Sequence, residues 1–144
     1  MDELDQKLVE LLALDSRIKV AGLAKKLKIP ASTAAARVVK LVKSGFLKRF
    51  TIELDYEKAG KPLLALCQVS VRHSKNDPDQ TIQALLKLAD VQEIYSTTGE
   101  WDFTIVIRTQ DIKSLKKLVT YDLKASLPDI VRSNTLIALE YGKK

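Results

Sequence analysis

Basic side chains are concentrated in one acid-free segment near the start of this 144-residue chain. Residues 16–52 hold ten Lys or Arg and neither Asp nor Glu. The ten cations are Arg17, Lys19, Lys25, Lys26, Lys28, Arg37, Lys40, Lys43, Lys48 and Arg49. Cations neutralise the phosphates of nucleic acids, whereas an acid in the same surface would repel them. The segment predicts double-stranded DNA as a partner; the alternative is a solvated basic face.

Side chains that could support catalysis or bind a metal are scarce. The chain has a single cysteine, Cys67, and a single histidine, His73, which together cannot provide an internal disulfide or a tetrahedral zinc site. Cys67 lies in an alternating apolar segment that favours a core position, and His73 precedes an expected surface loop. We therefore expect a protein that is not an enzyme and that uses no metal or cofactor.

The composition is that of a folded protein, with 46% hydrophobic residues, 29% charged residues and a formal net charge of +6. The first residues, 1–5, are acidic and are not followed by the apolar run of a signal peptide. No apolar run approaches the length of a membrane span. We expect a cytoplasmic protein without a membrane partner.

Three helices are predicted in the N-terminal part from apolar residues at helical spacing. The first follows a cap at Asp2, and the second covers about 20–27. The third covers about 31–44 and is closed by Gly45 as its C-cap. Its outward face carries small polar and basic residues, which is typical of the second helix of a helix-turn-helix. The alternative is a three-helix bundle with a basic surface.

The segment 46–54 alternates between apolar and polar residues, which predicts a strand that follows the helix-turn-helix as a wing or connector. Lys48 and Arg49 would then lie beside the DNA backbone. Gly60 and Pro62 interrupt the polar stretch that follows. We therefore expect an N-terminal helix-turn-helix (winged-helix-like) domain. The domains are placed at 1–54 for DNA binding, 55–62 for a linker and 63–144 for a second domain.

The second domain is predicted to be a ferredoxin-like βαββαβ fold, which makes the whole chain an α+β protein. The expected strands are 63–72, 91–97, 101–108 and 135–141, and the expected helices are about 78–89 and 112–126. The helices would bury Ile82, Leu85, Leu86 and Ala89, and then Ile112, Leu115, Leu118, Val119 and Leu123. Leu66, Val106 and Leu136 would lie on the other face of the sheet. These side chains are too apolar for one water-exposed patch, so we expect a homodimer in which a second copy covers them.

Residues in both predicted domains resemble one protein family. In the first domain they are Leu4-Asp5, Arg17, Leu23-Ala24, Ser32-Thr33, Arg37, Val38, Leu41, Gly45, Phe46-Leu47 and Leu54-Asp55 through Gly60. In the second domain the segment Thr97-Thr98-Gly99-Glu100-Trp101-Asp102 is similar to a Thr-Gly-x-x-Asp effector loop. Over nearly its whole length the chain resembles the Lrp/AsnC (leucine-responsive/asparagine-type) transcriptional regulators. The resemblance implies regulation of amino-acid metabolism.

The resemblance further implies that a small-molecule effector, an amino acid, binds at interfaces between dimers, in higher oligomers such as an octamer. The candidate effector-binding residues are Thr97, Thr98, Gly99, Trp101 and Asp102, together with Ser133 and Thr135 on the last strand. Hydroxyl and backbone N–H groups would bind the carboxylate of the amino acid, and Asp102 would accept from its ammonium. Without the resemblance, a simple hairpin turn with Asp102 as a surface carboxylate is the better explanation of the loop, and only the resemblance favours an effector site.

Two features of the third helix depart from the family. Pro30 cannot cap the helix with a side-chain oxygen, so Ser32 or Thr33 is expected to do so. The run of alanines at 34–36 leaves few side chains able to read base edges. We therefore expect phosphate contacts to dominate, with sequence preference partly from DNA bendability. The candidate DNA-binding residues are Ser32, Thr33, Ala36, Arg37, Lys40, Lys43, Lys48 and Arg49.

The leading hypothesis is a sequence-preferring, DNA-binding transcriptional regulator whose C-terminal domain dimerises and binds an amino-acid effector. One alternative is an architectural DNA-binding protein without an effector. Another is a small-molecule-sensing or enzymatic ferredoxin-like protein with a non-functional basic bundle. Glu100 could pair with a basic or amide side chain, and Trp101 could contact an apolar one. The sequence therefore leaves leucine-like, glutamine-like and basic effectors open.

Overall fold

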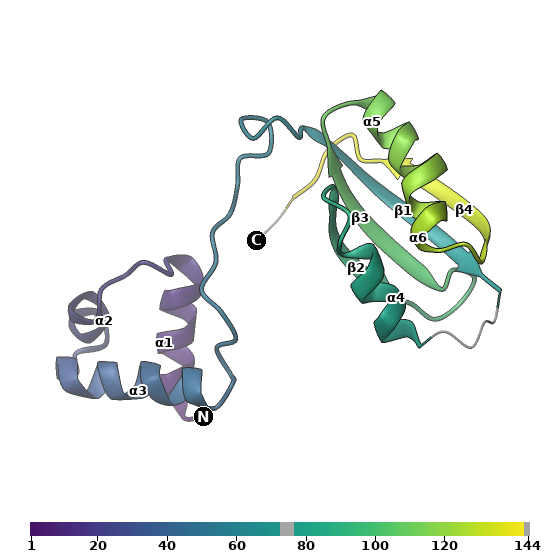
Figure 1. The fold of residues 1–144 in the computed structure, drawn as a ribbon. Helices are drawn as coiled ribbons and strands as arrows, with labels where there is room; N and C mark the ends of the chain where they lie inside the picture. Colours follow the sequence, from purple (N-terminus) through teal and green to yellow (C-terminus); the bar gives the residue numbers. More distant parts are fainter. Residues whose placement is uncertain (73–76, 143–144) are drawn as a thin grey trace. The chain divides into compact units, whose positions relative to one another are not determined.

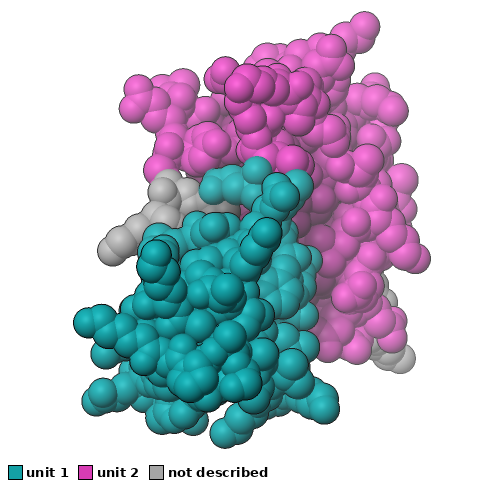
Figure 2. Space-filling view, turned by 90° about the vertical axis from the view of Figure 1, so that its left-hand side faces the viewer, with its two compact units in different colours: residues 1–53 teal, residues 54–144 magenta. Residues whose placement is uncertain are grey.

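The chain divides into two compact units, Met1–Glu53 and Leu54–Lys144 (Figures 1 and 2). The structure is a computed structural model that describes residues 1–72 and 77–142. Most of the surface loop expected after His73 falls on residues outside this described part, and its last residues, Asp77 and Pro78, begin a helix. Each unit has its own hydrophobic core, one between the helices of the first and one beneath the sheet of the second.

The first unit consists of three helices (Figure 1). They are α1 (Glu3–Leu14), α2 (Val20–Leu27) and α3 (Ala31–Lys43). The predicted cap at Asp2 is confirmed, because its carboxylate accepts a hydrogen bond from the Asp5 N–H at 2.8 Å. The Asp5 carboxylate in turn accepts one from the Asp2 N–H at 3.2 Å. This reciprocal capping box satisfies two N–H groups that an isolated helix end would leave without partners.

The turn between α2 and α3 is short and closed by backbone hydrogen bonds. Lys28 adopts a left-handed conformation with φ of 55°, and the Ile29 N–H donates to the Ala24 carbonyl at 3.0 Å. The predicted helix-turn-helix is therefore confirmed. Its apolar core consists of Leu8, Leu12, Leu23, Ala24, Ala34 and Leu41. Full burial of the small side chain of Ala34 lets the first turn of α3 approach the other helices closely.

Two expectations for the ends of α3 are wrong. Pro30 itself occupies the N-cap position, and no side chain caps the helix, so neither Ser32 nor Thr33 has that role. The Pro30 φ of −59° already fits the entry into a helix, because the proline ring fixes this angle. At the other end the C-cap is Ser44, and Gly45 follows it with φ of 74°, where glycine has no steric penalty.

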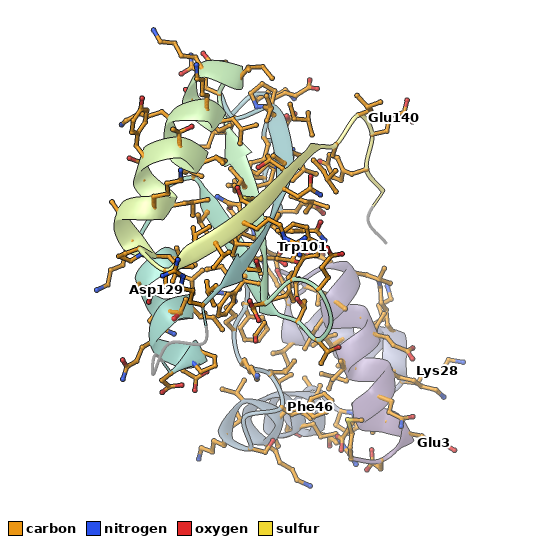
Figure 3. The ribbon with its side chains drawn as sticks, turned by 90° about the vertical axis from the view of Figure 1, so that its right-hand side faces the viewer. Glu3, Lys28, Phe46, Trp101, Asp129 and Glu140 are labelled. Carbon is orange, nitrogen blue, oxygen red and sulfur yellow. The ribbon has the colours of Figure 1, made fainter. Side chains whose placement is uncertain are left out.

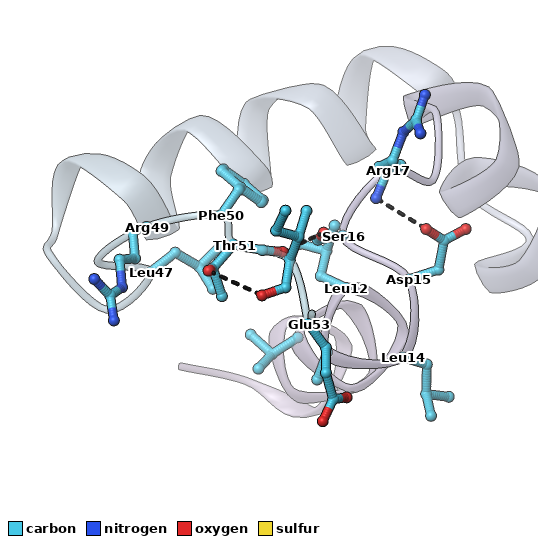
Figure 4. Close-up of a pocket in the computed structure, with 13 residues that line it drawn as sticks. Leu12, Leu14, Asp15, Ser16, Arg17, Leu47, Arg49, Phe50, Thr51 and Glu53 are labelled. Atoms are coloured by element: carbon cyan, nitrogen blue, oxygen red, sulfur yellow. Dashed lines mark hydrogen bonds between the residues drawn. The ribbon is translucent and has the colours of Figure 1, made fainter. Parts of the chain in front are cut away.

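The segment 46–54 does not form the predicted strand. A strand needs a neighbour to pair its N–H and C=O groups, and the described residues of the first unit include no other strand. The segment instead passes the end of α1, where the Ser16 hydroxyl donates to the Thr51 carbonyl at 3.2 Å (Figure 4). Phe50 and Ile52 remain 53% and 73% exposed. No wing is formed in this described segment.

The second unit is a four-stranded antiparallel sheet with helices on one face (Figure 1). Its strands are β1 (Leu63–Val71), β2 (Val91–Ser96), β3 (Phe103–Thr109) and β4 (Ile130–Ile137), in the spatial order β2-β3-β1-β4. Its helices are α4 (Pro78–Leu85), α5 (Ile112–Lys117) and α6 (Leu123–Ser126), with a π-helical turn, η1 (Leu118–Asp122), between the last two. This is the predicted βαββαβ order, so the fold class is confirmed.

The last strand is displaced from its predicted position. β4 begins at Ile130 instead of Thr135, and it ends at Ile137 instead of Tyr141. The early start arises because Ile130 pairs with Val71 at the end of β1. The polar residues that follow Ile130 give no strand signal by themselves, so only the neighbouring strand determines where β4 begins.

The core of the second unit lies between the sheet and its helices. Ala65, Cys67 and Val69 alternate along β1, and they pair with Ile107, Ile105 and Phe103 of β3 on the same buried face. The helices contribute Leu85, Leu115, Leu118 and Leu123. Burial raises the pKa of the Cys67 thiol, as expected for a core cysteine rather than a nucleophile.

The π turn explains how one helical segment buries residues at unequal spacing. Leu118 and Leu123 are five positions apart, and both are buried. The Leu123 N–H donates to the Leu118 carbonyl, which is the i to i+5 bond of a π turn. This extra residue per turn brings both leucines to the sheet. Ile112 was expected on the same face, but it is 59% exposed.

The segment 54–62, expected in large part as a linker, packs on the second unit. The Tyr56 hydroxyl donates to Gln92 Oε1 at 3.1 Å, and the Tyr56 ring lies 4.5 Å from the Arg108 guanidinium. Lys61 Nζ lies 2.8 Å from Asp90 Oδ1. These contacts account for the division of the chain between Glu53 and Leu54.

Candidate DNA-binding surface and effector loop

One face of α3 carries small and basic side chains. Ser32, Ala36, Lys40 and Lys43 are exposed on it, and Thr33 is half-buried beside them. Ser32, Thr33, Ala36 and Lys40 line a shallow hollow together with Asp2 and Arg37. A helix with short side chains along its exposed face can approach another surface closely. The structure thus brings together five of the eight DNA-binding candidates on one face of this helix.

Arg37, a sixth candidate, is engaged within the first unit. Its Nη1 lies 2.6 Å from Asp2 Oδ2 and 2.7 Å from Asp5 Oδ1. Hydrogen bonds from the Arg37 guanidinium are the main cause that holds the pKa of both carboxyls below the usual range. Because Asp5 is only 3% exposed, Arg37 supplies the cation that this buried carboxylate requires. A phosphate would have to compete with two carboxylates for the same guanidinium.

The remaining cationic candidates are exposed, and none has an acidic partner among the residues that the structure describes. Lys43 lies at the end of α3, and Lys48 and Arg49 follow in the segment without regular structure. Across residues 1–72 and 77–142, neither these three nor Lys40 forms an ion pair with a carboxylate. Their charge is therefore available to phosphate groups.

A second hollow of the first unit lies beside this basic segment. It is bounded by the end of α1, by the turn after it and by residues 47–53 (Figure 4). The Asp15 carboxylate accepts a hydrogen bond from the Arg17 N–H at 2.9 Å, which fixes the turn. The lining of the hollow combines apolar side chains such as Leu12 and Phe50 with charged ones. These lining residues include no pair of side chains suited to nucleophilic catalysis.

The segment 97–102 forms a closed loop between β2 and β3. The Thr97 N–H donates to the Asp102 carbonyl at 2.9 Å, and the Thr97 hydroxyl donates to the Trp101 carbonyl at 2.6 Å. Gly99, at the tip, has φ of 106°, a conformation that other residues rarely adopt. Trp101 lies in this loop (Figure 3). The Thr97 hydroxyl is thus used to close the loop.

Asp102 ties the loop to the end of β1. Its N–H donates to the Val69 carbonyl at 3.0 Å, and its Oδ2 accepts from the Val71 N–H at 2.8 Å. A carboxylate has about four acceptor sites, so one such bond leaves capacity for a ligand. Asp102 therefore combines a positioning role with the ability to accept further hydrogen bonds.

An arginine that the sequence did not single out completes this region. Arg132 Nη2 lies 2.8 Å from Glu100 Oε1, and its guanidinium lies 4.6 Å from the centre of the Trp101 ring. Arg132 is on β4, opposite Ser70 of β1. The strand prediction began β4 only at Thr135, so no sequence signal placed Arg132 beside the loop.

The other two effector candidates lie on the opposite face of the sheet. Ser133 pairs with Val69, and Thr135 pairs with Cys67, whose side chains face the helices. Cross-strand partners share a face, and successive residues alternate between faces. The Thr135 hydroxyl accordingly lies 3.5 Å from Cys67 Sγ. The structure therefore separates Ser133 and Thr135 from the face on which Arg132 lies.

The described residues hold neither a metal centre nor a membrane span. Within residues 1–72 and 77–142, no group of three or more His, Cys, Asp or Glu side chains could hold a metal ion. In the same ranges, every helix is too short or too polar to cross a bilayer.

Both halves of the chain match known domain families. Residues 1–42 match the AsnC-type helix-turn-helix domain, and residues 64–144 match the Lrp/AsnC ligand binding domain. The chain is 31% identical over 144 residues to the HTH-type transcriptional regulator FL11 of Pyrococcus horikoshii, covering 100% of this chain and 93% of that protein. It is 33% identical over 140 residues to the HTH-type transcriptional regulator LysM of Sulfurisphaera tokodaii, covering 96% and 95%.

Solved structures share the fold. The L-Met complex of a transcriptional regulator from Neisseria meningitidis has a TM-score of 0.91 at 21% identity, covering 100% of this chain and 93% of that one. An AsnC family transcriptional regulator from Agrobacterium tumefaciens has a TM-score of 0.91 at 24% identity, covering 100% and 94%.

Proposed function

We infer that this chain, which belongs to the Lrp/AsnC family of transcriptional regulators, binds duplex DNA through α3 and an amino acid through the loop 97–102. The observation that carries the DNA-binding part is the exposed face of α3. It combines small side chains with Lys40 and Lys43, neither of which forms an ion pair with a carboxylate in the described chain. The protein is a regulator rather than an enzyme.

The proposed DNA contacts divide by chemistry. Ser32 and Thr33 enter the major groove first, because the N-terminal residues of a recognition helix contact base edges. Ala36 offers only an apolar contact, so direct reading of bases is limited. Lys40, Lys43, Lys48 and Arg49 bind phosphates, and DNA deformability supplies part of the sequence preference. Arg37 holds α3 in place and contributes little direct phosphate binding.

A second copy is proposed to cover the sheet face that the helices leave open. Leu66 and Leu136 pair across β1 and β4 on that face, and Leu136 is 49% exposed. Val106 of β3, the other neighbour of β1, pairs with Leu66 on the same face. A homodimer would bury this apolar surface and carry two recognition helices for two DNA half-sites. Family resemblance supports assembly of dimers into higher oligomers such as an octamer.

The proposed effector is an amino acid held by Thr98, Gly99, Trp101 and Asp102. Backbone N–H groups around Gly99 and the Thr98 hydroxyl would bind the carboxylate, and Asp102 would accept from the ammonium. The L-Met bound to the Neisseria meningitidis regulator supports this ligand class. Thr97 shapes the loop, and Ser133 and Thr135 have no direct role in this proposal because they lie on the other face.

DNA binding is tested with labelled duplex from the region upstream of the protein's own gene. The variant Lys40→Ala/Lys43→Ala removes two cations from α3, and Lys58→Ala/Lys87→Ala removes two exposed cations from the second unit as a control. Each lost phosphate contact lowers the slope of log affinity against log salt by about 0.9. For Lys40→Ala/Lys43→Ala we expect this salt slope to be smaller in magnitude than that of the wild type by about 2, and for the control variant we expect no change. Equal slopes for the two variants would contradict the proposed surface.

Effector binding is tested by thermal-shift measurements with each of the twenty amino acids. A ligand at about 100 times its dissociation constant stabilises the folded state by about 2.7 kcal/mol, which is readily detected. We expect stabilisation by at least one amino acid and its loss in Asp102→Ala. Stabilisation by none of them would favour the architectural DNA-binding protein instead.

A further inference from the structure

A row of exposed lysines on the second unit has no role in the functions proposed above. Lys113, Lys116 and Lys117 lie on α5, and Tyr121 follows on η1 with 66% exposure. All three lysines are exposed, on the side away from the buried Leu115. The helical segment thus presents a cationic face to solvent while its apolar face covers the sheet.

These lysines surround a shallow hollow without an acid in its lining. The hollow is lined by Lys113, Ser114, Lys116, Lys117 and Tyr121. In the part of the chain that the structure describes, none of the three lysines forms an ion pair. The nearby Asp111 carboxylate is outside this lining. It accepts a hydrogen bond from the Ser114 N–H at 2.7 Å, which is the main cause of its lowered pKa, and the charge of Lys113 contributes to the same shift. Three ammonium groups and a hydroxyl therefore face solvent together.

We propose that this lysine face binds phosphates of the same DNA duplex that α3 holds, as a second contact on the DNA. The proposal rests on the DNA binding inferred for the first unit. Lys113 and Lys117 are four positions apart, which is about 6 Å along a helix axis. Phosphates of one DNA strand follow each other at about 3.4 Å along the duplex axis, so a row of cations can contact alternate phosphates. An open row suits an extended polyanion better than a single small anion.

The pairing of Arg37 within the first unit reduces the number of cations that α3 can offer to DNA phosphates. Because Arg37 is engaged by Asp2 and Asp5, α3 itself offers two cations, Lys40 and Lys43, that have no acidic partner within residues 1–72 and 77–142. Lysines on the second unit would extend the footprint beyond the recognition helix. Binding should therefore gain affinity from DNA length and not only from DNA sequence.

The test compares the full-length protein with the variant Lys116→Gln/Lys117→Gln, and with Lys58→Gln/Lys87→Gln as a matched control. Glutamine removes the charge and keeps a high helix propensity. Affinity is measured against salt on a short duplex of about 20 bp, close to two helical turns, and on a long duplex of about 60 bp. Circular dichroism and Trp101 fluorescence during melting verify that each variant is folded.

On the long duplex, we expect the lysine-face variant to lower the salt slope by about 2 and the affinity at low salt by about tenfold or more. The control variant should match the wild type on both duplexes. Equal behaviour of the two variants on the long duplex would overturn the inference. Stabilisation of the wild type by inorganic phosphate alone, with unchanged DNA slopes, would assign the face to a small anion and also overturn it.

The two proposals fail in distinguishable ways. If Lys40→Ala/Lys43→Ala leaves binding to the short duplex unchanged, the recognition surface on α3 is wrong. If that variant loses binding while Lys116→Gln/Lys117→Gln has no effect on either duplex, only the lysine face is wrong.

Discussion

Arg37 Nη1 lies 2.7 Å from Asp5 Oδ1, so the middle of α3 is joined to the first turn of α1 by an ion pair. The same guanidinium lies 2.6 Å from Oδ2 of Asp2, the residue that caps α1 through its Oδ1. The proposed recognition helix and the capping box are therefore held together by one guanidinium, which contacts both carboxylates. The loss of this contact would leave the Asp5 carboxylate, 3% exposed, without a cation.

We expect Arg37→Met to lower the melting temperature of the first unit while the second unit melts as before. The single tryptophan, Trp101, is in the second unit and reports on it by fluorescence, whereas circular dichroism also follows the helices of the first unit. The variant should shift the dichroism transition alone. An unchanged dichroism transition would contradict the stabilising role assigned to Arg37.

The difference in stability between wild type and Arg37→Met should shrink in acid. Arg37 lowers the pKa of Asp2 and Asp5 from the ordinary value of 3.8 in the folded state. Such groups stabilise the fold fully above the unfolded pKa, and this stabilisation is lost as the pH falls through the folded pKa. Dichroism melts from about pH 2 to pH 6 should show the two proteins converging at the acid end. A constant difference over this range would argue against the ion pair.

Local signals in the sequence predicted most of the fold. The cap at Asp2 acts within one turn of a helix, so it determines the start of α1 without the rest of the protein. Alternation along β1 and β3 determined their buried faces for the same reason. The segment 46–54 has the same alternation, but a strand also requires a partner, which local pattern does not provide.

Contacts between distant residues were the part that could not be predicted. Arg37 and Asp5 are 32 positions apart, and their pairing depends on how α1 and α3 cross. The contact of Arg132 with Glu100 depends on the register of β4, which the sequence pattern placed too late. Both arginines bear on proposed sites, so local pattern located the proposed surfaces but not the charges that are already engaged within them.

Core packing in the second unit predicts unequal effects for two isoleucines. Ile105 is fully buried in β3, so Ile105→Ala should lower the free energy of unfolding of this unit by about 2–5 kcal/mol. Ile112 is 59% exposed, so Ile112→Ala should change it by less than about 0.5 kcal/mol. Urea titration followed by Trp101 fluorescence measures both. A large effect of Ile112→Ala would contradict its exposed position and favour the buried position that its sequence spacing predicted.

The ion pair between Glu100 and Arg132 predicts how the affinity of the proposed loop site depends on the charge of the effector side chain. Because the Glu100 carboxylate is already paired, a basic effector must displace Arg132 to reach it. Arg132→Gln should therefore strengthen binding of lysine or arginine, by about fivefold at most because the pair is exposed, and leave methionine unaffected. Thermal-shift titrations with these amino acids test this. Equal changes for all of them would show that Arg132 acts on the loop as a whole.

If the apolar sheet face is the contact of the proposed homodimer, a single charged substitution on this face should dissociate the two copies. Leu136 lies on this face opposite Leu66, and it is 49% exposed in the single chain. Leu136→Glu should shift the protein toward monomers, because a second copy would have to bury the new carboxylate without a partner. Leu139→Glu is the control, since Leu139 lies beyond the end of β4 and is 95% exposed. If the proposed dimer forms through this face, sedimentation velocity should show dissociation for the first variant only. The same mass for both variants would contradict the proposed dimer face.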